Sequence, residues 1–123
     1  MINNRDEYSV MFYENEHGRV PVREFLEKLS LKERAKILKY IEFLREQNGI
    51  LDEPYSRHIA GKIRELRVDF GRVGYRIFYF LFIKKKIILL HAFTKNTEKT
   101  PPQEIQKAEY NMRQVIVNQK MYE

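Results

Sequence analysis

Three strand-like runs follow one another in residues 62–100, KIRELRVDFGRVGYRIFYFLFIKKKIILLHAFTKNTEKT. Glycine-containing turns and a lysine triplet separate the runs, and apolar and aromatic residues dominate them. Cations are interleaved with these residues, and they include Arg64, Arg67, Arg76, Lys95 and Lys99. A sheet that presents cations among aromatic side chains is typical of a nucleic-acid-binding surface.

The alternation within each run predicts which side chains share a face of the sheet. In the first run, Arg67 is expected to point away from Leu66 and Val68. In the last run, the residues expected on one face are His91, Phe93 and Lys95. Leu90 and Ala92 are expected on the opposite face. Arg76 lies in an almost continuously apolar run, where a cation is costly unless it reaches a partner or the sheet surface.

The residues before this stretch predict one strand and two helices. Residues 8–13 are rich in aromatic and β-branched residues and are expected to form a strand. Pro21 occupies a typical first position of a helix. Ser30 and Glu33 have the spacing of a capping box, which predicts the start of a second helix, and Asn48-Gly49 predicts its end. The two helices are expected to cover one face of the sheet.

The remaining segments predict a loop and a final helix. Residues 51–61, with a proline and a glycine, are expected to form a loop. Thr100 is expected to cap a C-terminal helix, because prolines and a glutamine follow it at suitable positions. The resulting order is β-α-α-β-β-β-α. The predicted fold class is α+β, with a small antiparallel-dominated sheet.

Composition limits the class of protein. A chain of 123 residues with 43% hydrophobic residues is long enough for one globular domain, expected over residues 1–123. No apolar run approaches the roughly 20 residues of a membrane-spanning helix. The N-terminus MINNRDE lacks the basic-then-apolar order of a signal peptide, so a cytoplasmic protein without a membrane partner is expected.

The absence of cysteine excludes a disulfide framework, a thiolate nucleophile and zinc sites that need sulfur. The three histidines, His17, His58 and His91, do not have the spacing that places two ligands on one metal. We therefore expect chemistry without a metal or a small-molecule cofactor.

The positive charge of the chain is concentrated in one region. The net charge is +6, but residues 57–86 contain nine basic and two acidic side chains, which gives +7. The other 93 residues contain 14 basic and 15 acidic side chains. Because the excess is local, it favours binding to a polyphosphate over a general role in solubility.

Arg67, Arg76 and Lys95 are the candidate catalytic cations. If a ribose 2′-hydroxyl attacks the adjacent phosphate of RNA, fixed cations stabilise the charge that develops on the phosphate oxygens. His91 and Glu65 are candidate proton carriers. Two structural alternatives stay open: Glu65 and Arg67 could form a simple ion pair, and His91 could be a half-buried, hydrogen-bonded residue.

Other residues have weaker functional interpretations. Arg64 and Lys99 are candidate RNA-binding cations, and Phe78 and Phe80 are candidate platforms for a stacked base. The alternative for these phenylalanines is the hydrophobic core. Residues 84–86, the lysine triplet, are expected to keep a turn solvated.

Three motifs together resemble a known family. Residues 63–70 carry ELR, residues 74–80 carry GYR, and residues 89–101 read LLHAFTKNTEKTP. The combination resembles the phage-derived HigB-like branch of the RelE/ParE toxin superfamily. The resemblance covers most of the chain, and it implies a RelE-like toxin of a type II toxin–antitoxin pair.

The resemblance also implies an activity and partners. Toxins of this kind are usually endoribonucleases (mRNA interferases) that cleave mRNA on the ribosome, and a small helix-turn-helix, HigA-like antitoxin is the usual partner. Arg76 corresponds to the arginine of the GYR motif, and Lys95 corresponds to the basic residue that closes the last strand. The second-strand lysines of RelE have only Arg67 as a cationic counterpart. A C-terminal tyrosine has no counterpart, which leaves the general base open.

Two other function classes fit the same sequence. One is a ParE-like toxin that inhibits DNA gyrase by binding, without hydrolysis. The other is a non-catalytic RNA-binding module, in which the basic face binds phosphate and cleaves nothing. The joint presence of the three motifs favours the nuclease.

Overall fold

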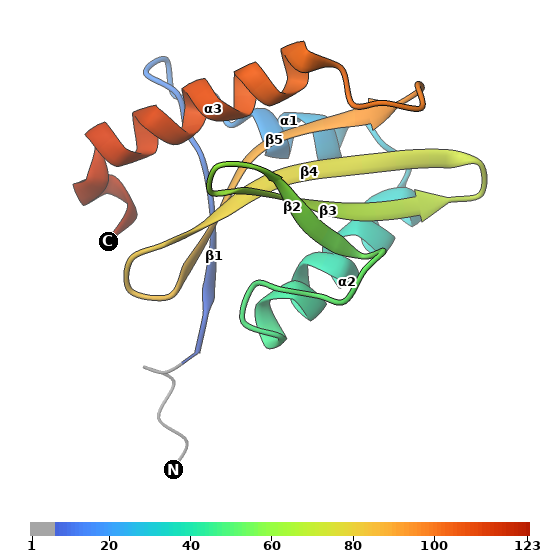
Figure 1. Cartoon of the computed structure of the whole chain (residues 1–123), viewed down its shortest axis with the longest axis horizontal. Helices are drawn as coiled ribbons and strands as arrows, with labels where there is room; N and C mark the ends of the chain where they lie inside the picture. Colours follow the sequence, from blue (N-terminus) through green and yellow to red (C-terminus); the bar gives the residue numbers. More distant parts are fainter. Residues whose placement is uncertain (1–6) are drawn as a thin grey trace.

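The computed structural model describes residues 7–123, which form one five-stranded sheet with helices on both faces (Figure 1). Residues 1–6 of the N-terminal segment considered above lie outside this range. In chain order the elements are β1 (Ser9–Phe12), α1 (Pro21–Glu27), α2 (Leu31–Glu46), β2 (Ser56–Ala60), β3 (Ile63–Phe70), β4 (Val73–Phe82), β5 (Lys86–Lys95), α3 (Pro102–Val117) and the short 3-10 turn η2 (Gln119–Tyr122).

The sheet has the strand order β1-β5-β4-β3-β2. β1 pairs with β5 in parallel, and the other neighbours are antiparallel. The predicted α+β class and the order of the predicted elements are confirmed. The turn between β4 and β5 contains Lys84 and Lys85 at positive φ, and both side chains are exposed.

β2 is an additional strand within residues 51–61, where a loop was predicted. It pairs with the first half of β3 and contains a register irregularity between His58 and Ala60. A five-residue edge strand with an irregularity has too little alternation to stand out in a sequence. The strand matters for function because it brings Arg57 directly opposite Glu65.

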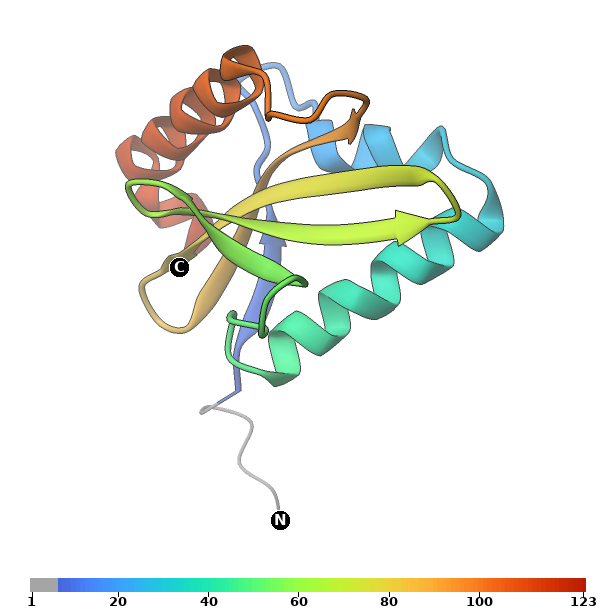
Figure 2. The same ribbon diagram turned by 45° about the vertical axis from the view of Figure 1, so that its right-hand side comes forward.

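Helices cover the two faces of the sheet unequally (Figure 2). On the face covered by α1 and α2, here called the helix-pair face, buried residues include Val22, Ile37, Leu44 and Tyr79. On the opposite face, here called the α3 face, the buried residues include Phe78, Phe80, Ile88, Leu90, Ala108 and Val115. The predicted cover of one face by the helix pair is therefore confirmed, and α3 covers part of the other.

The helix starts differ in their capping. At α2, the Ser30 hydroxyl accepts a hydrogen bond from Glu33 N, and the Glu33 carboxylate accepts one from Ser30 N, so the predicted capping box is confirmed. At α3, the predicted Thr100 cap is wrong. Pro101 is the N-cap and makes no side-chain capping bond, because the helix begins one residue later than the motif predicted.

A bulge in β5 changes which side chains share a face. Phe78 lies opposite His91, while Tyr79 lies opposite Leu89, so Leu90 is the extra residue. Leu90 packs with Phe78 on the α3 face, and the prediction that it points away from His91 and Lys95 is wrong. Because alternation is shifted at Leu90, residues 91, 93 and 95 follow the α3 face instead of the helix-pair face.

Candidate functional site

Part of the α3 face carries charged side chains beyond the apolar contacts of α3. The cation cluster, defined here as Arg57, Arg67, Arg76 and Lys95 around Glu65, comes from four neighbouring strands. Arg67 and Arg76 lie directly opposite each other across β3 and β4, and Lys95 lies opposite Gly74 at the end of β5. The sheet therefore brings together all three predicted catalytic cations, and β2 adds Arg57.

Glu65 lies at the centre of the cation cluster and is fully buried. Its Oε1 atom is 3.3 Å from Arg57 Nε, 3.8 Å from Arg67 Nε and 3.9 Å from Arg76 Nε. One carboxylate thus faces three guanidinium groups, and positive charge remains in excess. The predicted ion pair between Glu65 and Arg67 is present as one of these three contacts.

The cation cluster also contains unsatisfied polar atoms. Among residues 7–123, the buried side-chain nitrogen and oxygen atoms without a hydrogen-bond partner are Arg57 Nε, Arg76 Nε and both carboxylate oxygens of Glu65. Such atoms are costly in a protein interior, and they are commonly satisfied by water, an ion or a ligand. Three of the four atoms, Arg57 Nε, Arg76 Nε and Glu65 Oε1, face one another in the ion pairs described above, at 3.3 and 3.9 Å, so their charges compensate one another.

Arg76 is the most deeply placed cation of the cluster, with 5% of its surface exposed. Its Nη1 donates to the carbonyl of Tyr75 at 3.0 Å and to Asp69 Oδ1 at 3.2 Å. Gly74 makes room for this guanidinium, because a Cβ at position 74 would lie 3.1 Å from Nη1. The arginine is therefore fixed before any ligand arrives.

Lys95 differs from the arginines in its acid–base behaviour. Burial lowers the pKa of Lys95 below the ordinary value of 10.5, and repulsion by Arg76 lowers it further, while Glu65 acts in the opposite direction. Arg57 and Arg67 also lower this pKa. An ammonium group with a lowered pKa releases its proton more readily, so Lys95 suits proton donation as well as charge stabilisation.

His91 lies beside the cation cluster at the border of α3. Its Nε2 is 2.6 Å from Glu104 Oε2, and the two side chains are 12% and 18% exposed. The ring stacks on Phe93 with a centroid distance of 5.8 Å, and Phe93 lies opposite Arg76. The hydrogen-bonded, half-buried alternative for His91 is therefore present, and Phe93 separates it from Lys95 along the strand.

The predicted RNA-binding residues are not brought into the cation cluster. Arg64 lies on the helix-pair face, where its Nε donates to Tyr79 Oη at 3.4 Å, because it alternates with Glu65. Lys99 is exposed in the loop after β5. Phe78 and Phe80 are 0% and 1% exposed, so they have no free ring face for a base, and the core alternative is correct for both.

Arg57 is the site residue that the sequence prediction missed. It fell in the predicted loop, and its relation to Glu65 depends on the pairing of β2 with β3. The available signal was the start of the basic region at Arg57 itself. The local concentration of positive charge therefore included Arg57, but it predicted no role for this residue.

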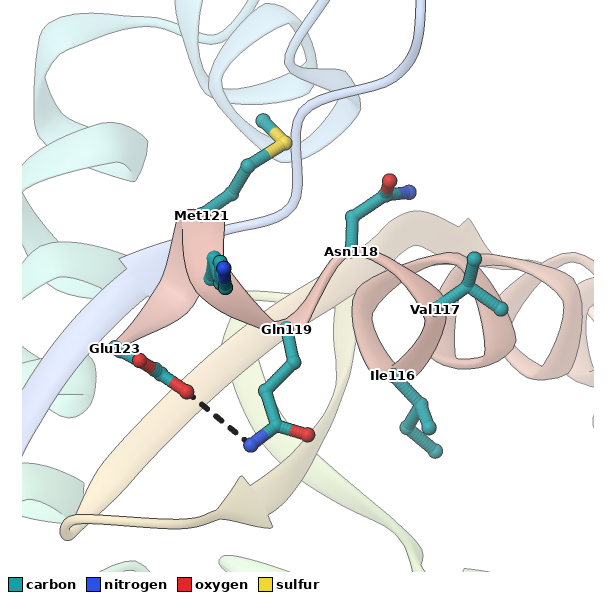
Figure 3. Close-up of a pocket in the computed structure, with 7 residues that line it drawn as sticks. Ile116, Val117, Asn118, Gln119, Met121 and Glu123 are labelled. Carbon is teal, nitrogen blue, oxygen red and sulfur yellow. Dashed lines mark hydrogen bonds between the residues drawn. The ribbon is translucent and has the colours of Figure 1, made fainter.

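A separate hollow lies at the C-terminal end of α3 (Figure 3). It is lined by residues 116–121 and Glu123, and Gln119 Nε2 donates to Glu123 Oε1 at 3.2 Å. Met121 and Ile116 point in opposite directions in this view, so they do not enclose an apolar pocket. Glu104 lies near the other end of α3, about 18 Å from Ile116 along the helix at 1.5 Å per residue.

Residues 7–123 contain neither a metal-binding group of side chains nor a membrane-spanning helix. No group of three or more histidine, aspartate or glutamate side chains in this range is arranged to hold a metal ion. None of its helices has the length and apolar character that crossing a membrane requires.

Comparison with families of known proteins gives a match over most of the chain. The model of a family described as phage-derived protein Gp49-like (DUF891) matches residues 24–113. No curated protein matches the chain. The matched range covers most of the chain and contains Arg57, Glu65, Arg67, Arg76 and Lys95.

Proposed function

The chain belongs to this Gp49-like family, which lies among the RelE/HigB-like toxins, and we propose that it is a toxin that cleaves mRNA without a metal ion. The observation that carries the proposal is the cation cluster, in which three guanidinium groups surround one buried carboxylate on the α3 face of the sheet. Its excess positive charge suits the phosphate backbone of RNA.

In the proposed reaction, the ribose 2′-oxygen attacks the adjacent phosphorus atom. A 2′,3′-cyclic phosphate forms as the bond from phosphorus to the 5′-oxygen breaks, and the 5′-oxygen takes up a proton. Negative charge on the non-bridging oxygens is stabilised by Arg67 and Arg76, which are held in position before the substrate binds. Lys95 donates the proton to the leaving 5′-oxygen, in accord with its lowered pKa.

The two predicted proton acceptors have different surroundings. His91 is the better supported one, because a hydrogen bond to Glu104 holds its ring in position on the α3 face. Glu65 is enclosed by guanidinium groups and is fully buried. Its position supports a positioning role, in which its charge holds the three arginines together.

The proposal includes the partners that the family resemblance implies. The mRNA is expected to be cleaved on the ribosome, and a helix-turn-helix antitoxin is expected to silence the toxin. An antitoxin that covers the cation cluster would place acidic groups against the excess positive charge.

The experiment is to express the wild-type chain and three variants from an inducible promoter. We expect the wild type to arrest growth and to truncate mRNA, as mapped by primer extension. Arg76→Gln and Lys95→Ala should each restore growth, because the loss of one transition-state contact lowers the rate on the order of a hundredfold. Arg72→Ala, in the exposed turn before β4, is the matched control and should remain toxic.

Two results would contradict the proposal in different ways. Intact mRNA together with inhibited DNA supercoiling would favour the gyrase-inhibiting alternative. Undiminished toxicity of both Arg76→Gln and Lys95→Ala would contradict the assignment of the site. The melting temperature of each purified variant shows whether a loss of toxicity comes from unfolding.

A further inference from the structure

Three aromatic side chains form an open cluster where α2 meets the loop before β2. The Tyr40 ring centroid is 6.2 Å from that of Phe43 and 6.1 Å from that of Tyr55. Phe43 and Tyr55 are 45% and 49% exposed. With Gln47 and Leu51, these rings line a cavity of about 270 Å³. Aromatic rings grouped at the surface in this way are typical of an interaction site.

Lysine side chains lie over the rings of this aromatic cluster. Lys36 Nζ is 5.7 Å from the centroid of the Tyr40 ring, and Lys39 Nζ is 5.8 Å from that of Phe43. Lys36 also donates a hydrogen bond to the carbonyl of Asp69, which ties α2 to β3. Rings for stacking combined with cations for phosphate are the two components of a surface that binds single-stranded nucleic acid.

A second cavity connects the aromatic cluster to the cation cluster. It has a volume of about 190 Å³ and is lined by Lys36, Tyr40, Pro54, Tyr55, Arg67 and Asp69. Two of these residues, Tyr40 and Tyr55, also line the first cavity. Arg67 belongs to the cation cluster, and its backbone N–H donates to the carbonyl of Tyr55 at 2.9 Å.

The aromatic cluster and the cation cluster meet at the edge of the sheet. β2 pairs with residues 63–66 of β3, so Arg67 lies just beyond this pairing. α2 runs along the sheet on the side away from α3 (Figure 2). A strand of RNA could therefore leave the cation cluster at Arg67, pass over this edge and reach the rings on α2.

We propose that the stacking groove, defined as Lys36, Tyr40, Phe43 and Tyr55, binds unpaired bases of a single-stranded RNA whose neighbouring phosphate occupies the cation cluster. This inference rests on the proposed function. It identifies where the RNA next to the bound phosphate contacts the protein. Its continuity with Arg67 favours RNA over a protein partner. The groove supplies the stacking role that the buried Phe78 and Phe80 do not.

The test measures binding of the full chain to a fluorescent single-stranded RNA with 2′-O-methyl riboses, which lack the attacking hydroxyl. Tyr55→Ala and Phe43→Ala should each weaken binding on the order of tenfold, because stacking on an aromatic ring contributes substantially per base. Neither should change the slope of log Kd against log salt. Arg67→Ala should reduce that slope by about one phosphate contact.

Two control variants keep the test specific. Tyr55→Phe retains the ring and should bind as the wild type does. Val117→Ala removes exposed apolar surface at the far end of α3 and should also leave the affinity unchanged. Melting temperatures of all variants exclude unfolding as the cause of weaker binding.

The outcomes separate this inference from the proposed function. Unchanged RNA affinity in Tyr55→Ala and Phe43→Ala, with weaker binding in Arg67→Ala, would overturn the stacking groove and leave the nuclease proposal intact. Absence of binding to the free RNA by the wild type would overturn the stacking groove, whereas intact mRNA in induced cells would overturn the nuclease proposal. If the groove variants bind RNA normally but abolish a wild-type dimer in sedimentation, the groove is a protein interface and the inference is wrong.

Discussion

The buried polar groups on the two faces of the sheet are held by different kinds of contact. On the helix-pair face, Tyr79 Oη donates to the carbonyl of Gly49 at 2.7 Å, and the Ser56 hydroxyl bonds to both backbone groups of Leu51 at 2.8 Å. On the α3 face, buried atoms of Arg57, Glu65 and Arg76 have no hydrogen-bond partner. Buried polar groups of the helix-pair face are thus paired by hydrogen bonds, whereas those of the α3 face are held by the ion pairs of the cation cluster.

The largest expected effect comes from removing the central charge of the cation cluster. Glu65→Gln keeps the shape of the side chain but leaves three guanidinium groups without their carboxylate. Breaking a buried charge arrangement in this way should lower the free energy of unfolding by about 3–5 kcal/mol. Urea unfolding measures the change, with the exposed Glu98→Gln as control. A loss below about 1 kcal/mol would show that Glu65 does not hold the arginines.

A substitution on the helix-pair face should change the stability of the chain but not its activity. Burial raises the pKa of Tyr79, so its hydroxyl stays protonated and acts as a donor to Gly49. Tyr79→Phe leaves that carbonyl unpaired and should cost about 1–3 kcal/mol of unfolding free energy. The rate of RNA cleavage should be unchanged. A large loss of rate in a folded variant would break the distinction between the two faces.

Arg57 tests whether β2 contributes to the chemistry. Arg57→Ala should lower the cleavage rate on the order of tenfold, or about 1.4 kcal/mol, which is less than expected for Arg76 because the Arg57 side chain is 38% exposed. Stability should change little, since Arg67 and Arg76 still face Glu65. Single-turnover cleavage of an mRNA bound to the ribosome measures the rate. A rate equal to that of the wild type would restrict the site to three strands.

On stability, Lys95 should give the smallest effect, with a defined dependence on pH. The pKa of Lys95 is lower in the folded chain than the ordinary 10.5, so this side chain binds more protons in the unfolded chain. The contribution of Lys95 to the free energy of unfolding therefore rises with pH up to about 10.5. Lys95→Met should therefore stabilise the chain at pH 7 by at most about 0.5 kcal/mol, allowing for solvent screening. This gain should disappear near pH 10.5. Thermal unfolding at both pH values measures it, and a destabilised variant at pH 7 would contradict the stated cause.

Much of the fold could be predicted because periodic patterns are local. The alternation of β3, the Ser30–Glu33 capping box and the stop at Asn48-Gly49 each depend on residues a few positions apart. β2 and the bulge at Leu90 could not be predicted in this way, because both depend on pairing with another strand. The Thr100 cap was incorrect although its motif is local, because α3 begins one residue later than the motif predicts.

The candidate site could be predicted only in part for a related reason. Arg67, Arg76 and Lys95 stood out because each is a cation in a strand-like run. The burial of Glu65 and the contribution of Arg57 depend on the register of β2, β3 and β4. Phe78 and Phe80 were ambiguous because a sequence does not show how far α3 extends over a strand.

The bulge at Leu90 divides β5 into two segments that serve different purposes. Before it, Ile87 and Leu89 pack against the helix pair, and Ile88 packs under α3. After it, Lys95 lies on the same side as Arg76 although strict alternation from Ile87 would have placed it against the helices. One inserted position therefore acts as a phase shift along the strand. It uncouples the hydrophobic pattern that builds the core from the pattern that places Lys95 in the cation cluster, so each can change in sequence without disturbing the other.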